Sequence, residues 1–186
     1  LLTINIKSKI LYPVISFILG VFLLCFFILD HVRFRIMDYL FSGIGDNYQI
    51  TKSIDSFKSG GFLGQGIGEG VISKKLPDSH SDFVYALISE ELGIIVAIII
   101  LFLYMIPYIR IHYMCQRSSN LFIITSLTGL SNIFLFQTII NISSTLNIIP
   151  TKGMTLPFVS YGGSSLFSSS LLIGFILVLI KDDINE

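Results

Sequence analysis

The sequence predicts an all-α polytopic membrane protein with about four transmembrane helices and one large extracytoplasmic loop. Hydrophobic residues make up 53% of the 186 residues and charged residues 13%, a balance typical of membrane proteins. The apolar residues fall into four long runs, and a run of about 20 such residues crosses a bilayer as a helix. The 12 basic and 12 acidic side chains cancel, so no overall field favours nucleic acid, and we expect no nucleic-acid partner.

The first two runs lie on either side of a long polar segment. Residues 10–29 form the first run, with Pro13 in its first turn, where a missing N–H is tolerated. Residues 30–82 are predicted to be an extramembrane loop with short amphipathic helices. Residues 83–106 form the second run, and we expect Pro107 to close that helix.

The remaining runs complete four spans. Residues 121–142 form a third, less apolar run, whose hydroxyl and amide side chains can bond across helices. A second polar loop, 143–164, precedes the last run at 165–180. Threading four spans places on one side the basic residues Lys7, Lys9, Arg110, Arg117 and Lys181. Because basic residues concentrate in cytoplasmic segments, we expect both termini in the cytoplasm and both polar loops outside.

Asp82 lies where the long loop meets the second run and is the strongest candidate for chemistry. A carboxylate at this boundary could act as a general base on a sugar or lipid-linked hydroxyl. The alternative is structural, because Asp is a favoured N-cap and would cap the helix that begins at Phe83. The spacing alone slightly favours the cap, and one residue could do both.

Four other loop residues each have two interpretations. His80 could be a proton shuttle or metal ligand, although a lone loop histidine is more often a surface residue. Lys74 and Lys75 could hold an anionic lipid headgroup and offset the charge of a pyrophosphate, or they could form a solvated or membrane-surface pair. Lys152, in the second loop, has the same two interpretations.

Glu90 and Glu91 follow Asp82 by eight and nine residues, inside the second run. In an unbroken helix they would lie about 12–13 Å deeper than Asp82 and on other faces, offset by roughly 80° and 180°. We therefore expect these two intramembrane carboxylates to pair with polar groups of other helices rather than to join Asp82 in catalysis.

Six glycines between Gly60 and Gly70 precede these residues. They allow the backbone to approach a ligand closely, or they form a flexible connector. Neither a phosphate-binding nor a dinucleotide-binding pattern is present, for want of a Gly-Lys-Ser/Thr sequence and of a strand–turn–helix frame. The two cysteines, Cys25 and Cys115, lack metal-ligand spacing, so the residues by themselves predict no metal site.

Two long motifs carry a resemblance to a known family. GGFLGQGIGEG with LPDSHSDFVYALISEELG, and then IIPTKGMTLPFVSYGGSS at 148–165, closely resemble the SEDS family of bacterial cell-envelope proteins. The resemblance runs from about His31 to the C-terminus, and the glycine-rich segment is most similar to the FtsW branch. It implies that residues 1–186 are the C-terminal portion of a ten-helix SEDS fold, without the roughly six preceding spans.

The resemblance also implies an activity and a site. Family members are peptidoglycan glycosyltransferases that polymerise lipid II at the outer face of the bacterial inner membrane, and the FtsW branch does so at the division septum. The family's His-Thr-Asp-Phe motif reads His80-Ser81-Asp82-Phe83 here, which makes Asp82 the expected catalytic base. The residues expected to bind substrate are His80, Lys74, Lys75, Lys152, Ser160 and Ser164.

The expected partners follow from the same resemblance. They are lipid II and the undecaprenyl-linked glycan, a class B penicillin-binding transpeptidase, other divisome proteins and membrane lipids. A divalent cation, Mg or Mn, is the expected cofactor, meeting the charge of the leaving pyrophosphate. Two other functions stay open: a non-catalytic divisome scaffold, and a lipid II flippase with a polar path supplied by Glu90, Glu91, Asn132, Gln137 and Asn141.

Overall fold

A computed structural model of the protein describes residues 8–30, 32–33, 36–37, 47–150 and 153–185. The chain divides into two units, Leu1–Gly45 and Asp46–Glu186, which are described separately. All secondary structure in the described part of the chain is helical, as the sequence predicts.

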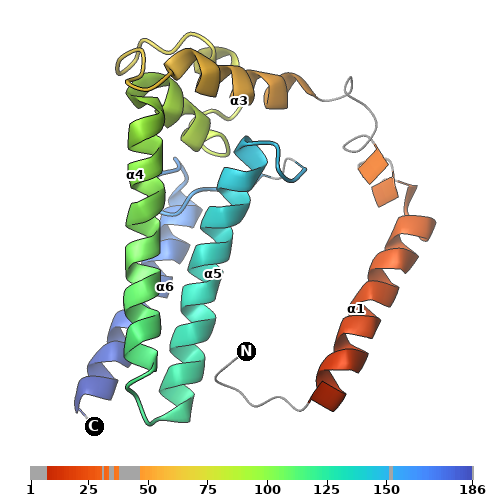
Figure 1. The fold of residues 1–186 in the computed structure, drawn as a ribbon, viewed down its shortest axis with the longest axis vertical. Coiled ribbons are helices and arrows are strands. Elements are labelled where there is room, and N and C mark those ends of the chain that lie inside the picture. The colour runs from red at the N-terminus through yellow and green to blue at the C-terminus, as the bar shows by residue number, and fades with distance from the viewer. Residues whose placement is uncertain (1–7, 31, 34–35, 38–46, 151–152, 186) are drawn as a thin grey trace. The chain divides into compact units, whose positions relative to one another are not determined.

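The first unit contains α1, Ser8–Ile28, a helix of 21 residues (Figure 1). It coincides closely with the predicted span 10–29 and holds Pro13 inside its first turns. Large apolar side chains on α1 are exposed, such as Phe17 at 73% and Phe27 at 74%. Its apolar segment Ile15–Ile28 is shorter than the three candidate membrane spans of the second unit.

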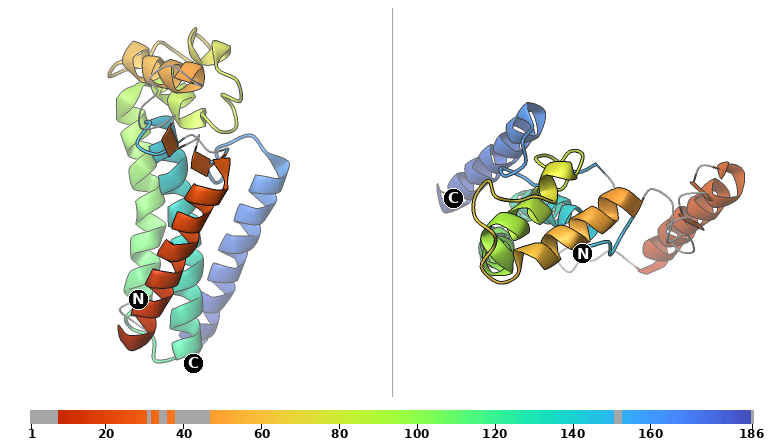
Figure 2. Two further views of the ribbon diagram at one scale, coloured as in Figure 1. Left: turned by 90° about the vertical axis from the view of Figure 1, so that its right-hand side faces the viewer. Right: turned by 90° about the horizontal axis from the view of Figure 1, so that it is seen from above.

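The second unit is built on three long helices. Its helical elements, in chain order, are α3 Asn47–Gly60, the 3₁₀ turn η1 Ser73–Lys75, α4 Val84–Cys115, α5 Leu121–Thr145 and α6 Gly163–Asn185. Within the described residues, α4, α5 and α6 are long and apolar enough to cross a membrane. Figures 1 and 2 show these three running lengthwise, with α5 packed against both α4 and α6, and α3 lying across the end of α4.

The prediction that Pro107 closes the second span is wrong. Helix α4 continues through Pro107 to Cys115, so residues 108–115 are helical as well. A proline interrupts only one backbone hydrogen bond, and helix packing can hold the chain on either side of it. Here Tyr104 and Ile111 are both buried in the helix interfaces, which keeps the helix continuous across the proline.

Helix α4 is kinked at Gly93, where φ is 87° and ψ is 167°. A short helix, residues 84–92, therefore precedes the long part of α4 and is turned away from its axis beneath α3 (Figure 1). Only glycine fits this turn, because an added Cβ would lie 2.3 Å from the carbonyl oxygen of Phe62. The break at Gly93 decides where Asp82 and Glu90 lie.

Buried side chains of α4 and α5 form the core beside the short helix. Tyr85 and Ala97 of α4 pack with Phe134 of α5, and the rings of Tyr104 and Phe134 are 5.6 Å apart. Leu156, from the loop between α5 and α6, is fully buried in the same cluster. The core therefore fixes this loop against the start of α4.

Candidate functional site

A tight turn places Asp82 before α4. Asp78 has φ 55°, and its carbonyl oxygen accepts hydrogen bonds from the amides of Ser81 and Asp82, both at 3.0 Å. The N-cap of α4 is Phe83, with no hydrogen bond from a capping side chain. The alternative that Asp82 serves as the N-cap is therefore wrong, and its carboxylate is not used to begin the helix.

Asn141, near the end of α5, holds the Asp82 backbone against the second loop. Its side chain is fully buried, and Nδ2 donates to the carbonyl oxygens of Asp82 at 2.9 Å and of Met154 at 2.5 Å. Beside it, a Cβ added to Gly153 would lie 2.9 Å from Oδ2 of Asp82. The backbone at Gly153 thus passes directly along the carboxylate.

Further contacts join the two motifs. The amide of Tyr161 donates to the carbonyl oxygen of His80 at 2.8 Å. Ser160 Oγ donates to the carbonyl oxygen of Ser81 at 2.5 Å and accepts from the amide of Leu156 at 2.7 Å. The residue pairs 81–160 and 82–141 are 79 and 59 positions apart in sequence, so tertiary packing assembles this site.

The surroundings of Asp82 raise the pKa of its carboxyl above the usual aspartate value. Partial burial is the largest cause, because it disfavours the charged form; the nearby charge of Asp78 adds to it, and the Ser81 side chain partly opposes it. A raised pKa makes the carboxylate a stronger base, which suits proton abstraction from a hydroxyl.

The other predicted site residues differ in their exposure to solvent. His80 has an exposed side chain, Ser164 is exposed at the start of α6, and Lys75 is exposed in η1. Lys74 is exposed as well, and its Nζ donates to the carbonyl oxygen of Gly68 at 2.6 Å. Lys152 lies outside the described residues.

Ser160 differs from these exposed residues. Its side chain is buried, and both of its hydrogen bonds go to the backbone of the two joined loops. In this structure it holds the loops together, and its expected contact with substrate stays a prediction.

Glu90 does not pair with other spans, contrary to the expectation from the sequence. It is fully buried, and Oε1 accepts the amides of Val71 at 3.0 Å and Ile72 at 2.9 Å, while Oε2 accepts that of Ser73 at 2.7 Å. The expectation failed because the turn at Gly93 sets the short helix against the preceding loop. Glu90 thus fixes η1 and the residues before it to the start of α4.

The glycines of the preceding loop fit backbone against backbone. A Cβ added to Gly60 would lie 2.0 Å from the carbonyl oxygen of Ser89, and one added to Gly64 would lie 2.2 Å from that of Glu91. The amides of Gln65 and Gly66 donate to the Glu90 and Glu91 carbonyl oxygens, both at 2.9 Å. The sequence predicts either close approach to a ligand or a flexible connector for these glycines. The structure shows a third role, in which Gly60 and Gly64 allow the loop to pack closely on the short helix.

Sequence reasoning missed Asn141 and Gly153 as site residues. Asn141 stood out only as a polar residue within a span, and Gly153 only as a member of the Pro-Thr-Lys-Gly motif. The available signal was an amide side chain near the end of an apolar helix, which has to find polar partners. The sequence could not say that the partner is the Asp82 backbone.

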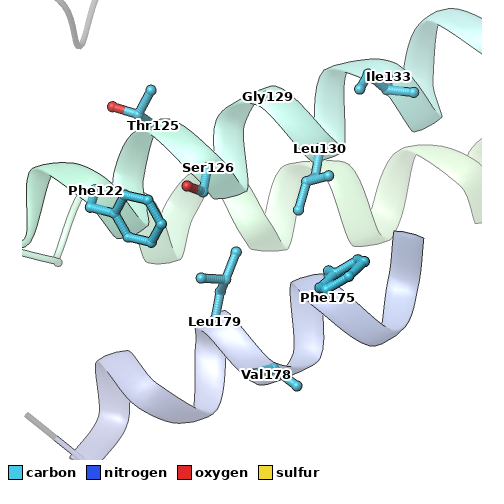
Figure 3. A pocket seen from close by; sticks show the side chains of 9 residues that line it. All are labelled: Phe122, Thr125, Ser126, Gly129, Leu130, Ile133, Phe175, Val178 and Leu179. Atoms are coloured by element: carbon cyan, nitrogen blue, oxygen red, sulfur yellow. The ribbon is translucent and has the colours of Figure 1, made fainter. Parts of the chain in front are cut away.

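No group of three or more His, Cys, Asp or Glu side chains able to hold a metal occurs among the residues that the structure describes. A groove of about 460 Å³ lies between α5 and α6 (Figure 3). It is mostly apolar and is lined by Phe122, Thr125, Ser126, Gly129, Leu130, Ile133, Phe175, Val178 and Leu179. Even Ile133 is about 12 Å along α5 from Asn141, at 1.5 Å per residue, so the groove is not part of this site.

Comparisons with known proteins agree with the motifs. A family profile described as "Cell cycle protein", for FtsW, RodA and SpoVE, matches residues 1–184, which takes the resemblance upstream of His31. The probable peptidoglycan glycosyltransferase FtsW of Caulobacter vibrioides is 38% identical over 156 residues, covering 84% of this chain and 40% of that protein. The protein of the same description from Buchnera aphidicola is 44% identical over 137 residues, covering 72% of this chain and 34% of that protein.

Two solved structures share the fold. One, described as "Structural coordination of polymerization and crosslinking by a peptidoglycan synthase complex", has a TM-score of 0.70 at 23% identity and covers 97% of this chain and 51% of that chain. The other, a mutant of the rod shape determining protein RodA from Thermus thermophilus, has a TM-score of 0.53 at 27% identity, covering 63% and 42%. The chain thus spans less than half the length of the curated relatives quoted above.

Proposed function

The chain belongs to the FtsW, RodA and SpoVE family of cell cycle proteins, and we propose that it carries the catalytic aspartate of a peptidoglycan glycosyltransferase that polymerises lipid II. Because the chain spans less than half of its curated relatives, the activity is proposed for the whole enzyme that contains this site. The observation that carries the proposal is the position of Asp82: a half-buried carboxylate of raised pKa, unused as a cap, at the junction of both family motifs.

In the proposed reaction Asp82 acts as general base. Its carboxylate removes the proton from the acceptor sugar hydroxyl of lipid II, and the resulting oxygen nucleophile bonds to the anomeric carbon of the growing glycan. The bond from that carbon to undecaprenyl pyrophosphate breaks, and the pyrophosphate leaves with the bonding electrons.

Several residues support this step in the proposal. Asn141 and Ser160 hold the backbone of residues 81 and 82, so they act as positioning residues. Lys74 and Lys75 are exposed cations in the same outer loop and would meet the negative charge of the pyrophosphate. Lys152 and His80 are proposed to contact substrate on the basis of the motifs alone.

A Mg or Mn ion is not assigned to a protein site. Such ions use oxygen ligands and are often held by one or two carboxylates together with substrate phosphates. The described residues offer the pair Asp78 and Asp82, which by itself does not make a metal cage. We therefore keep the cation as a proposal in which it arrives with the pyrophosphate, and no step depends on it.

The proposed setting is the bacterial inner membrane at the division septum, with both polar loops on the outer side. The three long apolar helices support an integral membrane protein. A class B penicillin-binding transpeptidase is the proposed partner, consistent with a shared fold in a complex described as coordinating polymerization and crosslinking. Other divisome proteins are proposed from the family alone.

Of the five polar residues proposed for a flippase path, three bond to loop backbone in this structure, which supports the enzyme over the flippase. Glu90 bonds loop amides, Asn141 bonds the Asp82 backbone, and Gln137 Nε2 donates to the carbonyl oxygen of Thr155 at 3.1 Å. These groups hold loops in place rather than line an open route. A scaffold without chemistry would predict that Asp82 tolerates substitution.

The deciding experiment measures lipid II polymerisation by the full-length enzyme reconstituted with its transpeptidase. Asp82→Asn removes the base while keeping size, and we expect it to abolish glycan synthesis. Asp55→Asn, on α3, is the matched control and should retain it, because Asp55 forms an ion pair at 3.7 Å with Lys52 of the same helix. Equal synthesis by wild type and Asp82→Asn would reject the proposal and favour the scaffold.

A further inference from the structure

The loop between α3 and η1 exposes an unusual set of apolar side chains. We call residues 61–71 the glycine loop. Its exposed apolar side chains are Phe62 at 76%, Leu63 at 84%, Ile67 at 81% and Val71 at 57%. Several large apolar side chains exposed within one short loop indicate a surface that something apolar covers.

The glycine loop adjoins the start of the long part of α4, whose apolar side chains are exposed. The amide of Ile94, the first residue after the kink, donates to the carbonyl oxygen of Gly61 at 3.0 Å. Along α4 beyond this point Ile95, Ile99 and Phe102 are 46%, 50% and 63% exposed, as expected for a spanning helix in contact with lipid. The apolar side chains that begin at Phe62 therefore lie next to an exposed apolar face of a helix long enough to cross a membrane.

The backbone of the glycine loop is suited to such a position. Unpaired peptide groups are costly near hydrocarbon. Much of this backbone is paired within the protein: the amides of residues 64, 65, 66 and 69 donate to the carbonyl oxygens of Gly60, Glu90, Glu91 and Gly66. The loop is thus held as a fixed platform, and Figure 1 shows it at the α3 end of the long helices.

We propose that the glycine loop lies in the membrane interface, with Phe62, Leu63 and Ile67 inserted among the acyl chains of the leaflet that borders the α3 end. The polar residues Gln65 and Glu69 are exposed between them and stay at headgroup level. Phospholipid is the occupant that we propose, because the loop is bonded at Gly61 to the start of an apolar helix long enough to cross a membrane. This inference does not depend on the proposed activity.

The test uses the absence of tryptophan from the sequence. Phe62→Trp places the only indole of the 186-residue chain on the loop, and Leu63→Trp gives an independent second reporter. Each variant is reconstituted in phosphatidylcholine vesicles containing a phospholipid brominated in the acyl chain near the headgroup. Phe102→Trp, on the exposed face of α4, reports lipid contact, and Lys58→Trp, at the exposed end of α3, reports water contact.

We expect Phe62→Trp and Leu63→Trp to lose most of their fluorescence in brominated vesicles, as Phe102→Trp does, and to resist quenching by aqueous iodide. Lys58→Trp should show the opposite pattern. The proposal fails if both loop reporters are quenched by iodide and not by brominated lipid. It fails equally if they become shielded from iodide only when the transpeptidase is added, since the loop would then be a protein-docking surface.

Discussion

Removing the Glu90 carboxylate should release the loop that precedes α4. Glu90→Ala takes away the carboxylate that accepts three consecutive amides, those of Val71, Ile72 and Ser73. A buried donor left without a partner costs about 1–3 kcal/mol, so three give about 3–9 kcal/mol. The Val71 and Ile72 bonds are only partly buried and water can replace them in part, so we expect about 3–5 kcal/mol.

A carboxamide should have an intermediate effect. Glu90→Gln keeps the size and one acceptor oxygen, which can still serve two amides, but it turns an NH₂ group toward the third. We expect a loss of about 1–3 kcal/mol for this variant. We therefore expect stability to decrease in the order wild type, Glu90→Gln, Glu90→Ala. Because Gln has nearly the same volume as Glu, the first step measures the loss of charge and of one acceptor oxygen.

Amide hydrogen exchange of the purified protein in detergent measures this directly. A loss of about 3 kcal/mol corresponds to roughly 100-fold faster exchange at residues 71–73. Glu91→Gln is the matched control, because the backbone carbonyl of Glu91, not its side chain, accepts the amide of Gly66. If exchange at residues 71–73 is the same in wild type, Glu90→Ala and Glu91→Gln, the Glu90 contacts do not hold the loop and the reasoning is refuted.

Three further predictions concern the site, each measured as lipid II polymerisation by the full-length enzyme. Asp78→Asn removes a negative charge that raises the pKa of Asp82, so this pKa should fall. Because the base works only when ionised, the acid limb of the pH–rate profile should move to lower pH. An acid limb that does not move would show that the charge of Asp78 does not affect Asp82. Gly153→Ala should lower the rate by about tenfold or more, because its Cβ would press on Oδ2 of Asp82 at 2.9 Å, whereas Gly163→Ala, with open space around it, should be neutral. Asn141→Leu removes two hydrogen bonds, so it should lower stability by about 1–3 kcal/mol and the rate as well; wild-type kcat in a folded variant would show that Asn141 does not position the base.

The relation between sequence and fold differs from helix to helix. The end of α5 lies close to its prediction, at Thr145 rather than 142, because the polarity of the residues changes there. The end of α4 lies at Cys115 and not at the predicted Pro107, because the prediction rests on the effect that proline has in an isolated helix. Burial of Tyr104 and Ile111 against neighbouring helices outweighs that local effect, and a local pattern does not contain it.

In the candidate site, too, the sequence predicts which residue to test, and the fold determines its surroundings. The His-Ser-Asp-Phe motif located Asp82 correctly as the residue to test, but its surroundings come from positions far along the chain. Whether Asp82 caps a helix depends on the backbone at Phe83, and its pKa depends on how deeply the fold buries it. The motif itself therefore predicts neither the capping role of Asp82 nor its pKa.

The sequence by itself determined the membrane class, the positions of the long apolar helices and the family, because hydropathy and motifs are local properties of the chain. Tertiary structure alone decided the partner of each buried polar group. Glu90 lies in an apolar run and looked like a membrane carboxylate, yet a left-handed turn at Gly93 gives it three amides 17 to 19 residues away. A buried charge takes whichever donors the fold brings within about 3 Å, and that choice is made by packing, not by neighbours in sequence.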